Sequence, residues 1–269
     1  MKFKSRLVIL LCAAISSIAG AQTFAAPISD ESVMPRVSIA LSTAIVMVHC
    51  KPGQSTTQTL TIVNYTSNNI RFNLETEDVV VRDGERSYVP AGQIPNGIAA
   101  SSVASPSSLM LKAGEEASVQ VTFTFPPETK QRAVVTLFRG VVLTADGGVG
   151  LRSSLGTLIT FDLSSDFRVE AGPVQTSLQT PAANLILSEE LRNSGSEPVT
   201  PTGVVVILNT SGKLVAKAAF SLQRLLPAER LTFAATNPAH LAPGKYRTLT
   251  SFEFEGKVLT SAGQFTIPE

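Results

Sequence analysis

The stretch Val119-Gln120-Val121-Thr122-Phe123-Thr124-Phe125 alternates strictly between apolar and polar residues. Successive side chains of a β-strand point to opposite faces, so these Val and Phe side chains share one face. The same alternation recurs more briefly in Leu60-Thr61-Ile62, Phe72-Asn73-Leu74 and Phe252-Glu253-Phe254. These runs predict half-buried strands and an all-β protein.

Further strands and turns surround these runs. Ala133 to Thr144 is nearly all apolar, which predicts a central strand that is buried on both faces. Turn signals such as Pro52-Gly53, Asp83-Gly84 and Pro243-Gly244 separate the apolar runs. Short strands at this spacing are typical of β-sandwiches.

The composition excludes several classes of protein. The chain has 269 residues, of which 43% are hydrophobic and 16% charged, which suggests one large domain or two ordinary ones. Without residues 1–21, the 22 basic residues fall to 19 against 21 acidic ones, a net charge of −2. This charge argues against a nucleic-acid-binding protein. With only two His and two Cys, the chain has few ligands for metals and few groups for acid–base catalysis.

The N-terminus has the pattern of a secretory signal peptide. Lys2, Lys4 and Arg6 precede an apolar stretch at 7–15, and Ala19-Gly20-Ala21 fits the cleavage pattern. We predict a signal peptide at 1–21, cleavage before Gln22 and export from the cytoplasm. The apolar stretch is shorter than the roughly 20 residues that a spanning helix needs, so we expect no transmembrane anchor. Cys50 is then the single cysteine, and no internal disulfide can form.

The mature chain divides at Ala171-Gly172-Pro173, where the strand pattern begins afresh. We predict two tandem immunoglobulin-like β-sandwich domains after the cleaved signal peptide, at 35–170 and 173–269. The Pro-Gly turn that precedes Tyr246 matches the tyrosine corner of such sandwiches. Residues 82–108 are expected to form a long loop. Residues 213–226 fit either a helix or a hairpin strand at Leu214–Ala219, and the Asn-Thr-Ser-Gly turn before them favours the hairpin.

The sequence offers little catalytic chemistry. Gly147-Gly148-Val149-Gly150 lacks the remainder of a phosphate-binding loop. His49 and Cys50 are neighbours on a predicted strand and therefore point to opposite faces. Glu75, Glu77 and Asp78 could suggest acid–base chemistry, but Glu75 and Glu77 share a strand face, and a solvated face explains them. We therefore expect a protein that is not an enzyme, with no catalytic residue, metal site, cofactor or small-molecule substrate.

The run from Val149 to Leu163 is the candidate binding element. Its odd positions are largely apolar, and we take Leu151, Leu155, Ile159 and Phe161 as candidates for binding a partner strand. Leu158 is the one apolar residue at an even position. A terminal strand of this kind at a sheet edge can accept a strand from a partner. In that case Ile159 and Phe161 should face away from a closed core. The alternative is a long core strand that links the two sandwiches.

The chain resembles periplasmic pilus (PapD-like) chaperones and related bacterial envelope proteins with tandem immunoglobulin-like domains. The matching stretches are Pro52-Gly53 through Thr61-Ile62-Val63-Asn64, Pro106 through Leu111-Lys112-Ala113-Gly114-Glu115, Phe125-Pro126-Pro127, Gly156 to Phe161, Leu191-Arg192-Asn193-Ser194-Gly195 with Pro198-Val199, Leu226-Pro227-Ala228-Glu229 and Leu241 to Tyr246.

The resemblance implies a non-catalytic binding protein of the periplasm or cell envelope, periplasmic or secreted. It would hold a β-rich, pilin-like or surface-protein subunit by β-strand addition, as in fimbrium assembly. The family also anchors its subunit's carboxylate with an Arg and a Lys. Here Arg36 lies before the first strand, and Leu158 lies near the expected Lys. A structural or adhesive component of a surface assembly is the alternative function.

Overall fold

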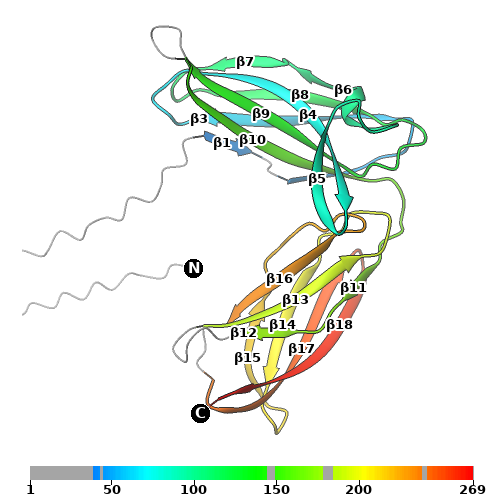
Figure 1. Ribbon diagram of the computed structural model, residues 1–269, viewed down its shortest axis with the longest axis vertical. Helices are drawn as coiled ribbons and strands as arrows, with labels where there is room; N and C mark the ends of the chain where they lie inside the picture. The colour runs from blue at the N-terminus through cyan, green and yellow to red at the C-terminus, as the bar shows by residue number, and fades with distance from the viewer. Residues whose placement is uncertain (1–38, 43–44, 144–148, 178–183, 238–240, 269) are drawn as a thin grey trace, which may run out of the picture. The chain divides into compact units, whose positions relative to one another are not determined.

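The computed structural model describes residues 39–42, 45–143, 149–177, 184–237 and 241–268. The predicted signal peptide at 1–21 lies outside these residues. All of the described residues fall within one compact unit, Val37–Glu269. They form two β-sandwiches of the immunoglobulin-like kind, which confirms the predicted fold class (Figure 1). No helix among the described residues has the length and apolar character needed to cross a membrane.

The first sandwich consists of two sheets. One sheet has the order β1-β3-β8-β6, and the other has the order β2-β10-β9-β4-β5, with β7 also beside β4. A single turn of 3-10 helix, Ala99–Ser101, precedes β6. The strand bounds are β1 Ile39–Ser42, β2 Ile45–His49, β3 Ser55–Asn64, β4 Ile70–Arg82, β5 Glu85–Pro90, β6 Ser102–Ser105, β7 Ser108–Leu111, β8 Glu116–Thr124, β9 Ala133–Leu143 and β10 Val149–Asp162.

The second sandwich also has two sheets. In one, β11 and β12 pair with one edge of β13, and β16 pairs with the same strand; the other has the order β15-β14-β17-β18. The strand bounds are β11 Val169–Ala171, β12 Gln175–Ser177, β13 Leu185–Asn193, β14 Thr202–Leu208, β15 Leu214–Ala219, β16 Arg230–Asn237, β17 Gly244–Phe254 and β18 Lys257–Ile267.

Alternating side chains build the core of each sandwich. In β8, Val119, Val121 and Phe123 are fully buried, and Phe125 directly after this strand is buried too. They pack in one cluster with apolar residues of β3, β4, β9 and β10. A separate cluster around Leu187, which contains Tyr246, fills the second sandwich. Each sandwich therefore has its own hydrophobic core.

The tyrosine corner is present in the second sandwich. The Tyr246 hydroxyl donates a hydrogen bond to the carbonyl oxygen of Ala242 at 2.7 Å. Its ring stacks on that of Phe265, with the ring centres 5.4 Å apart. The Pro-Gly-x-Tyr pattern in the sequence therefore has the structural role expected of it.

Each sandwich contains the same hydrogen-bonded element, which we call the asparagine corner. In the first sandwich, Asn64 at the end of β3 donates from Nδ2 to the carbonyl oxygens of Leu111 at 3.2 Å and Lys112 at 3.0 Å. Glu115 accepts a bond from the Lys112 amide at 2.7 Å. Gly114, between them, has φ +76°, a left-handed conformation that glycine adopts without strain.

In the second sandwich, Asn193 at the end of β13 donates to the carbonyl oxygen of Leu225 at 3.1 Å. Glu229 accepts a bond from the Leu226 amide at 2.7 Å. The left-handed position is here taken by Ala228, with φ +65°. Four of the stretches that carry the resemblance contain residues of the asparagine corner, two stretches in each sandwich.

Three expectations about local structure have clear outcomes. The hairpin interpretation of 213–226 is confirmed, since β15 pairs with β14 in antiparallel register. The long loop at 82–108 is wrong, because β5, the 3-10 turn and β6 lie within it. The sheets change from the first sandwich to the second before Val169, slightly earlier than the expected boundary at 171–173, because β11 already pairs with β13.

Candidate functional site

Strand β10 is paired on one side along its length and on the other side only near its end. Its antiparallel register with β9 runs from Val149 to Thr160. Parallel pairing with β2 covers Leu158–Asp162 only. No described strand pairs with the outer edge of residues 149–157. Unpaired backbone groups at such an edge can bond an additional strand from a partner.

Strand β2 pairs with only a short part of this edge because the chain passes from one sheet to the other between β1 and β2. The preceding strand β1 pairs with β3 in the opposite sheet of the sandwich, where Ser42 lies beside Thr61. β2 then begins at Ile45, which lies opposite Leu158. The position of this change in the chain determines how much of β10 remains open.

The candidate residues on β10 have different surroundings. Ile159 and Phe161 have 0% exposure in the core of the first sandwich. Leu155 is partly buried and packs against the same core, and the side chain of Leu151 lies outside the described residues. The expectation that Ile159 and Phe161 face away from a closed core is therefore wrong.

Aromatic packing from the opposite sheet explains this burial. The Phe161 ring lies 5.4 Å from that of Phe123 and 4.7 Å from that of Phe125, measured between ring centres. β8 thus covers the end of β10 nearest the junction between the sandwiches. Leu163, just after β10, is only partly buried and packs against the same core.

The unusual Leu158 faces the other side of the sheet. It packs there with Val135 and with Leu226 from the second sandwich, in a small apolar cluster that is separate from both cores. Position 156 must be glycine for this packing, because a Cβ would lie 2.8 Å from a methyl group of Val135 and 2.9 Å from one of Leu137. The apolar exception in the sequence thus marks an outer face that contacts the second sandwich.

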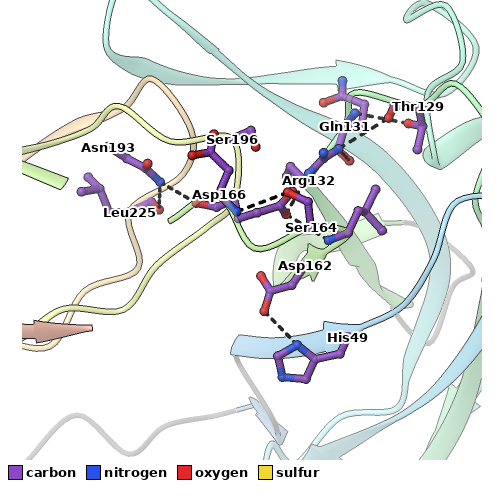
Figure 2. Close-up of polar contacts among 12 residues, drawn as sticks. His49, Thr129, Gln131, Arg132, Asp162, Ser164, Asp166, Asn193, Ser196 and Leu225 are labelled. Carbon is purple, nitrogen blue, oxygen red and sulfur yellow. Dashed lines mark hydrogen bonds and ion pairs between the residues drawn. The ribbon is translucent and has the colours of Figure 1, made fainter. Parts of the chain in front are cut away.

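Ion pairs connect the two sandwiches at their junction. Arg86 on β5 donates to both carboxylate oxygens of Glu229, at 2.5 and 3.0 Å. Arg132, just before β9, donates to Glu197 at 2.9 Å, and Glu197 also accepts bonds from Leu163 N at 3.0 Å and the Ser164 hydroxyl at 2.5 Å. Figure 2 shows Arg132 and Ser164 among these contacts. Glu197 and Glu229 are almost fully buried, so the negative charge of each has to be compensated by its arginine.

These pairs bear on the carboxylate anchor that the resemblance implies. A pocket of about 530 Å³ at the junction is lined by Arg86, Arg224, Glu229, Ile45 and Leu222, among others. Arg86 is already neutralised by Glu229. The Arg224 guanidinium donates to the Thr160 hydroxyl. Arg86 and Arg224 thus each contact a group of the protein itself, and Arg230 also lines the pocket.

Asp162, the last residue of β10, is an unusual carboxylate. Its side chain is only 3% exposed and lies 3.0 Å from Nδ1 of His49, which is 78% exposed (Figure 2). Neither carboxylate oxygen accepts a hydrogen bond from a described residue, so the imidazole lies close to the carboxylate without hydrogen-bond geometry. Burial raises the pKa of Asp162 to about 6; His49 opposes the rise, and Glu197 and Glu255 add to it.

The other sequence candidates for chemistry have structural roles. Glu75 and Glu77 both bind Arg139, at 2.5 and 2.8 Å. Asp78 is buried and accepts bonds from the amides of residues 98 and 99, which fixes the 3-10 turn to β4. Burial and the charge of Asp162 raise the pKa of Cys50 to about 11, which disfavours a reactive thiolate. The described residues contain no cluster of His, Cys, Asp and Glu suited to a metal ion.

The charged residues of the junction were not predicted from the sequence. Arg86, Arg132 and Glu197 have no local pattern, and the partners of each pair lie far apart in the chain. Glu229 was noticed only as part of a fold marker. A signal was available for it, because the equivalent Glu115 occupies the same place in the first sandwich.

No protein-family model matches the sequence, and no curated protein matches it. Solved structures do. The class 5 fimbriae chaperone CfaA is 16% identical with a TM-score of 0.44, over 83% of this chain and 98% of that chain. The CsuC–CsuE chaperone–tip adhesion subunit pre-assembly complex of Acinetobacter baumannii has 9% sequence identity and a TM-score of 0.43, over 84% of this chain and 97% of that chain. The E. coli chaperone DraB has 14% sequence identity and a TM-score of 0.39, over 86% of this chain and 98% of that chain. Most of the similar solved structures are thus PapD-like pilus chaperones.

Proposed function

We propose that this protein is a non-catalytic, pilus-chaperone-like binding protein of the bacterial periplasm or cell envelope. It holds a β-rich partner subunit through an additional strand at the edge of β10. The observation that carries the proposal is the incomplete pairing of β10, since β2 covers only Leu158–Asp162. We assign no role to nucleic acid, to a cofactor or to a small-molecule substrate.

The four candidate residues divide into two roles in this proposal. Ile159 and Phe161 are held in the core and fix the end of β10 in the sandwich. Leu155, which is only partly buried, and Leu151 contact the partner. Backbone hydrogen bonds along the open edge supply affinity that does not depend on the partner's sequence, and these two leucines supply selectivity. The carboxylate anchor is not part of the proposal, because Arg86 is neutralised internally.

One observation favours a second candidate function, a structural component of a surface assembly. β18 is an 11-residue strand at the end of its sheet, and none of its residues is fully buried. A long edge strand can pair with the same strand of another copy. Self-association through β18 would then build the assembly.

A photo-crosslinking residue at Ser154, which is exposed on the open part of β10, tests the proposal in the organism's own envelope. We expect an adduct with a small β-rich protein, identified by mass spectrometry. Thr57, exposed on β3 of the same sandwich, is the matched control and should give no adduct. Equal adducts at both positions, or none at Ser154, would reject the proposal. An adduct of two copies from a probe at Val258 would favour the second candidate.

A further inference from the structure

Asp162 lies where the two sandwiches meet, and groups from both of them face it. His49 belongs to β2 of the first sandwich. Arg224 and Glu197 of the second sandwich contact residues beside it in the chain: Arg224 donates to the Thr160 hydroxyl, and Glu197 accepts bonds from the Leu163 amide and the Ser164 hydroxyl. Arg224, Glu197 and Glu255 also act electrostatically on the carboxylate. The linker to the second sandwich begins at the next residue. The surroundings of this carboxylate therefore depend on the contact between the sandwiches.

The carboxylate is poorly solvated in this arrangement. It has almost no exposed surface, and no described residue donates a hydrogen bond to either oxygen. A buried carboxylate without donors strongly favours its neutral form. Two acidic neighbours, Glu197 and Glu255, favour the neutral form further, and His49 and Arg224 oppose it.

We propose that Asp162 makes the contact between the two sandwiches proton-dependent, so that acidification tightens the junction and ionisation of the carboxylate loosens it. Opening the junction would return water to the carboxylate and move Glu197 and Glu255 away from it. Both changes lower its affinity for a proton. A group that binds its proton more tightly in the closed state favours that state when the pH falls.

The size of the effect follows from the two proton affinities. The closed state has a pKa of about 6 for Asp162, and a solvated aspartate has about 3.9. Between about pH 7.5 and about pH 4.5, full solvation on opening gives a shift of roughly 25-fold toward the closed state. Partial solvation gives less. Attraction between the ionised carboxylate and Arg224 acts in the opposite direction, but it is the weakest of the named influences.

Hydrogen exchange of one backbone amide reports on the junction directly. The Arg230 amide of the second sandwich donates to the Gly84 carbonyl oxygen of the first at 2.9 Å. The Phe125 amide, which donates to Gln54 O at 2.9 Å, lies within the first sandwich and serves as the internal control. Protection factors corrected for intrinsic exchange separate opening of the junction from unfolding of the sandwich.

In the full-length protein, we expect the protection factor at Arg230 to rise by up to about 25-fold over this pH range, relative to that at Phe125. Asp162→Asn should keep Arg230 protected at both ends of the range, because the amide cannot ionise. Asp83→Asn, at an exposed carboxylate in the β4–β5 turn, is the matched control and should behave like the wild type.

His49→Gln should move the transition to higher pH, since the histidine opposes protonation of Asp162. The proposal is rejected if Asp162→Asn retains the pH dependence of the wild type. It is equally rejected if protection at Arg230 falls on acidification, because attraction to Arg224 would then outweigh solvation. An unchanged Phe125 amide shows that each variant is folded.

Discussion

Replacing Ile159 or Leu155 with Thr separates the two roles that we assign along β10. Ile159 is completely buried and lies between Val134 on β9 and Val46 on β2. The change deletes packed hydrocarbon, at a cost of about 0.5–1.5 kcal/mol. It also buries a hydroxyl without a partner, which costs about 1–3 kcal/mol more. We therefore expect the free energy of unfolding to fall by about 1.5–4.5 kcal/mol.

Leu155→Thr should have the opposite profile. Leu155 is only partly buried, so the loss of stability should be about 1 kcal/mol. Capture of the partner should fall much more, because this side chain is proposed to contact it. Both effects are measured on each variant, stability by urea unfolding and capture by the yield of the Ser154 crosslink.

The comparison between the two variants decides whether this reasoning is right. An Ile159→Thr protein that unfolds within about 0.5 kcal/mol of the wild type would show that this part of β10 is not core. A folded Leu155→Thr protein that captures its partner as well as the wild type would remove Leu155 from the binding surface. Because both changes introduce threonine into one strand, a general effect on strand propensity cancels between them.

Four further expectations follow. Tyr246→Phe should cost about 0.5–1.5 kcal/mol in chemical unfolding through loss of its hydrogen bond, and a neutral result would contradict the tyrosine corner. Ala228→Gly should stabilise the protein by up to about 1 kcal/mol because it relieves a left-handed alanine, whereas Gly114→Ala should destabilise it by about 1–2 kcal/mol; equal effects of the two would contradict the backbone argument. Reductant should leave the melting temperature unchanged, and a shift of several degrees would mean that Cys50 has a covalent partner. Mass spectrometry of the exported protein should find Gln22 as its first residue, and a retained Met1 would contradict the signal peptide.

The sequence was informative wherever structure depends on neighbouring residues. Alternation of apolar residues identified strands such as β8, because a buried strand face needs an apolar residue at every second position. The Pro-Gly turn before Tyr246 identified a corner for a similar local reason. Strand β6 within 82–108 was missed because it has only four residues, two of them serine, and its pairing with β8 determines it.

The candidate site was less accessible from sequence. The open edge of β10 depends on where the chain leaves β1 for β2, which no local pattern reports. Asp162 occupies an even position like the exposed Arg152 and Ser154, so the sequence gives no reason to expect its burial. Glu197, Glu255 and Arg224 of the second sandwich act on its charge. Its environment is thus created by residues far away in the chain.

Because the asparagine corner occurs in both sandwiches, the contacts of one copy can be compared with those of the other. Glu115 and Glu229 make the same bond to a nearby amide, but only Glu229 has also acquired an arginine from the other sandwich. The same fold element thus makes an additional contact in the second sandwich. Mutations at Glu229 therefore combine damage to the local fold with damage to the junction. The matching mutation at Glu115 shows how much of that damage is local.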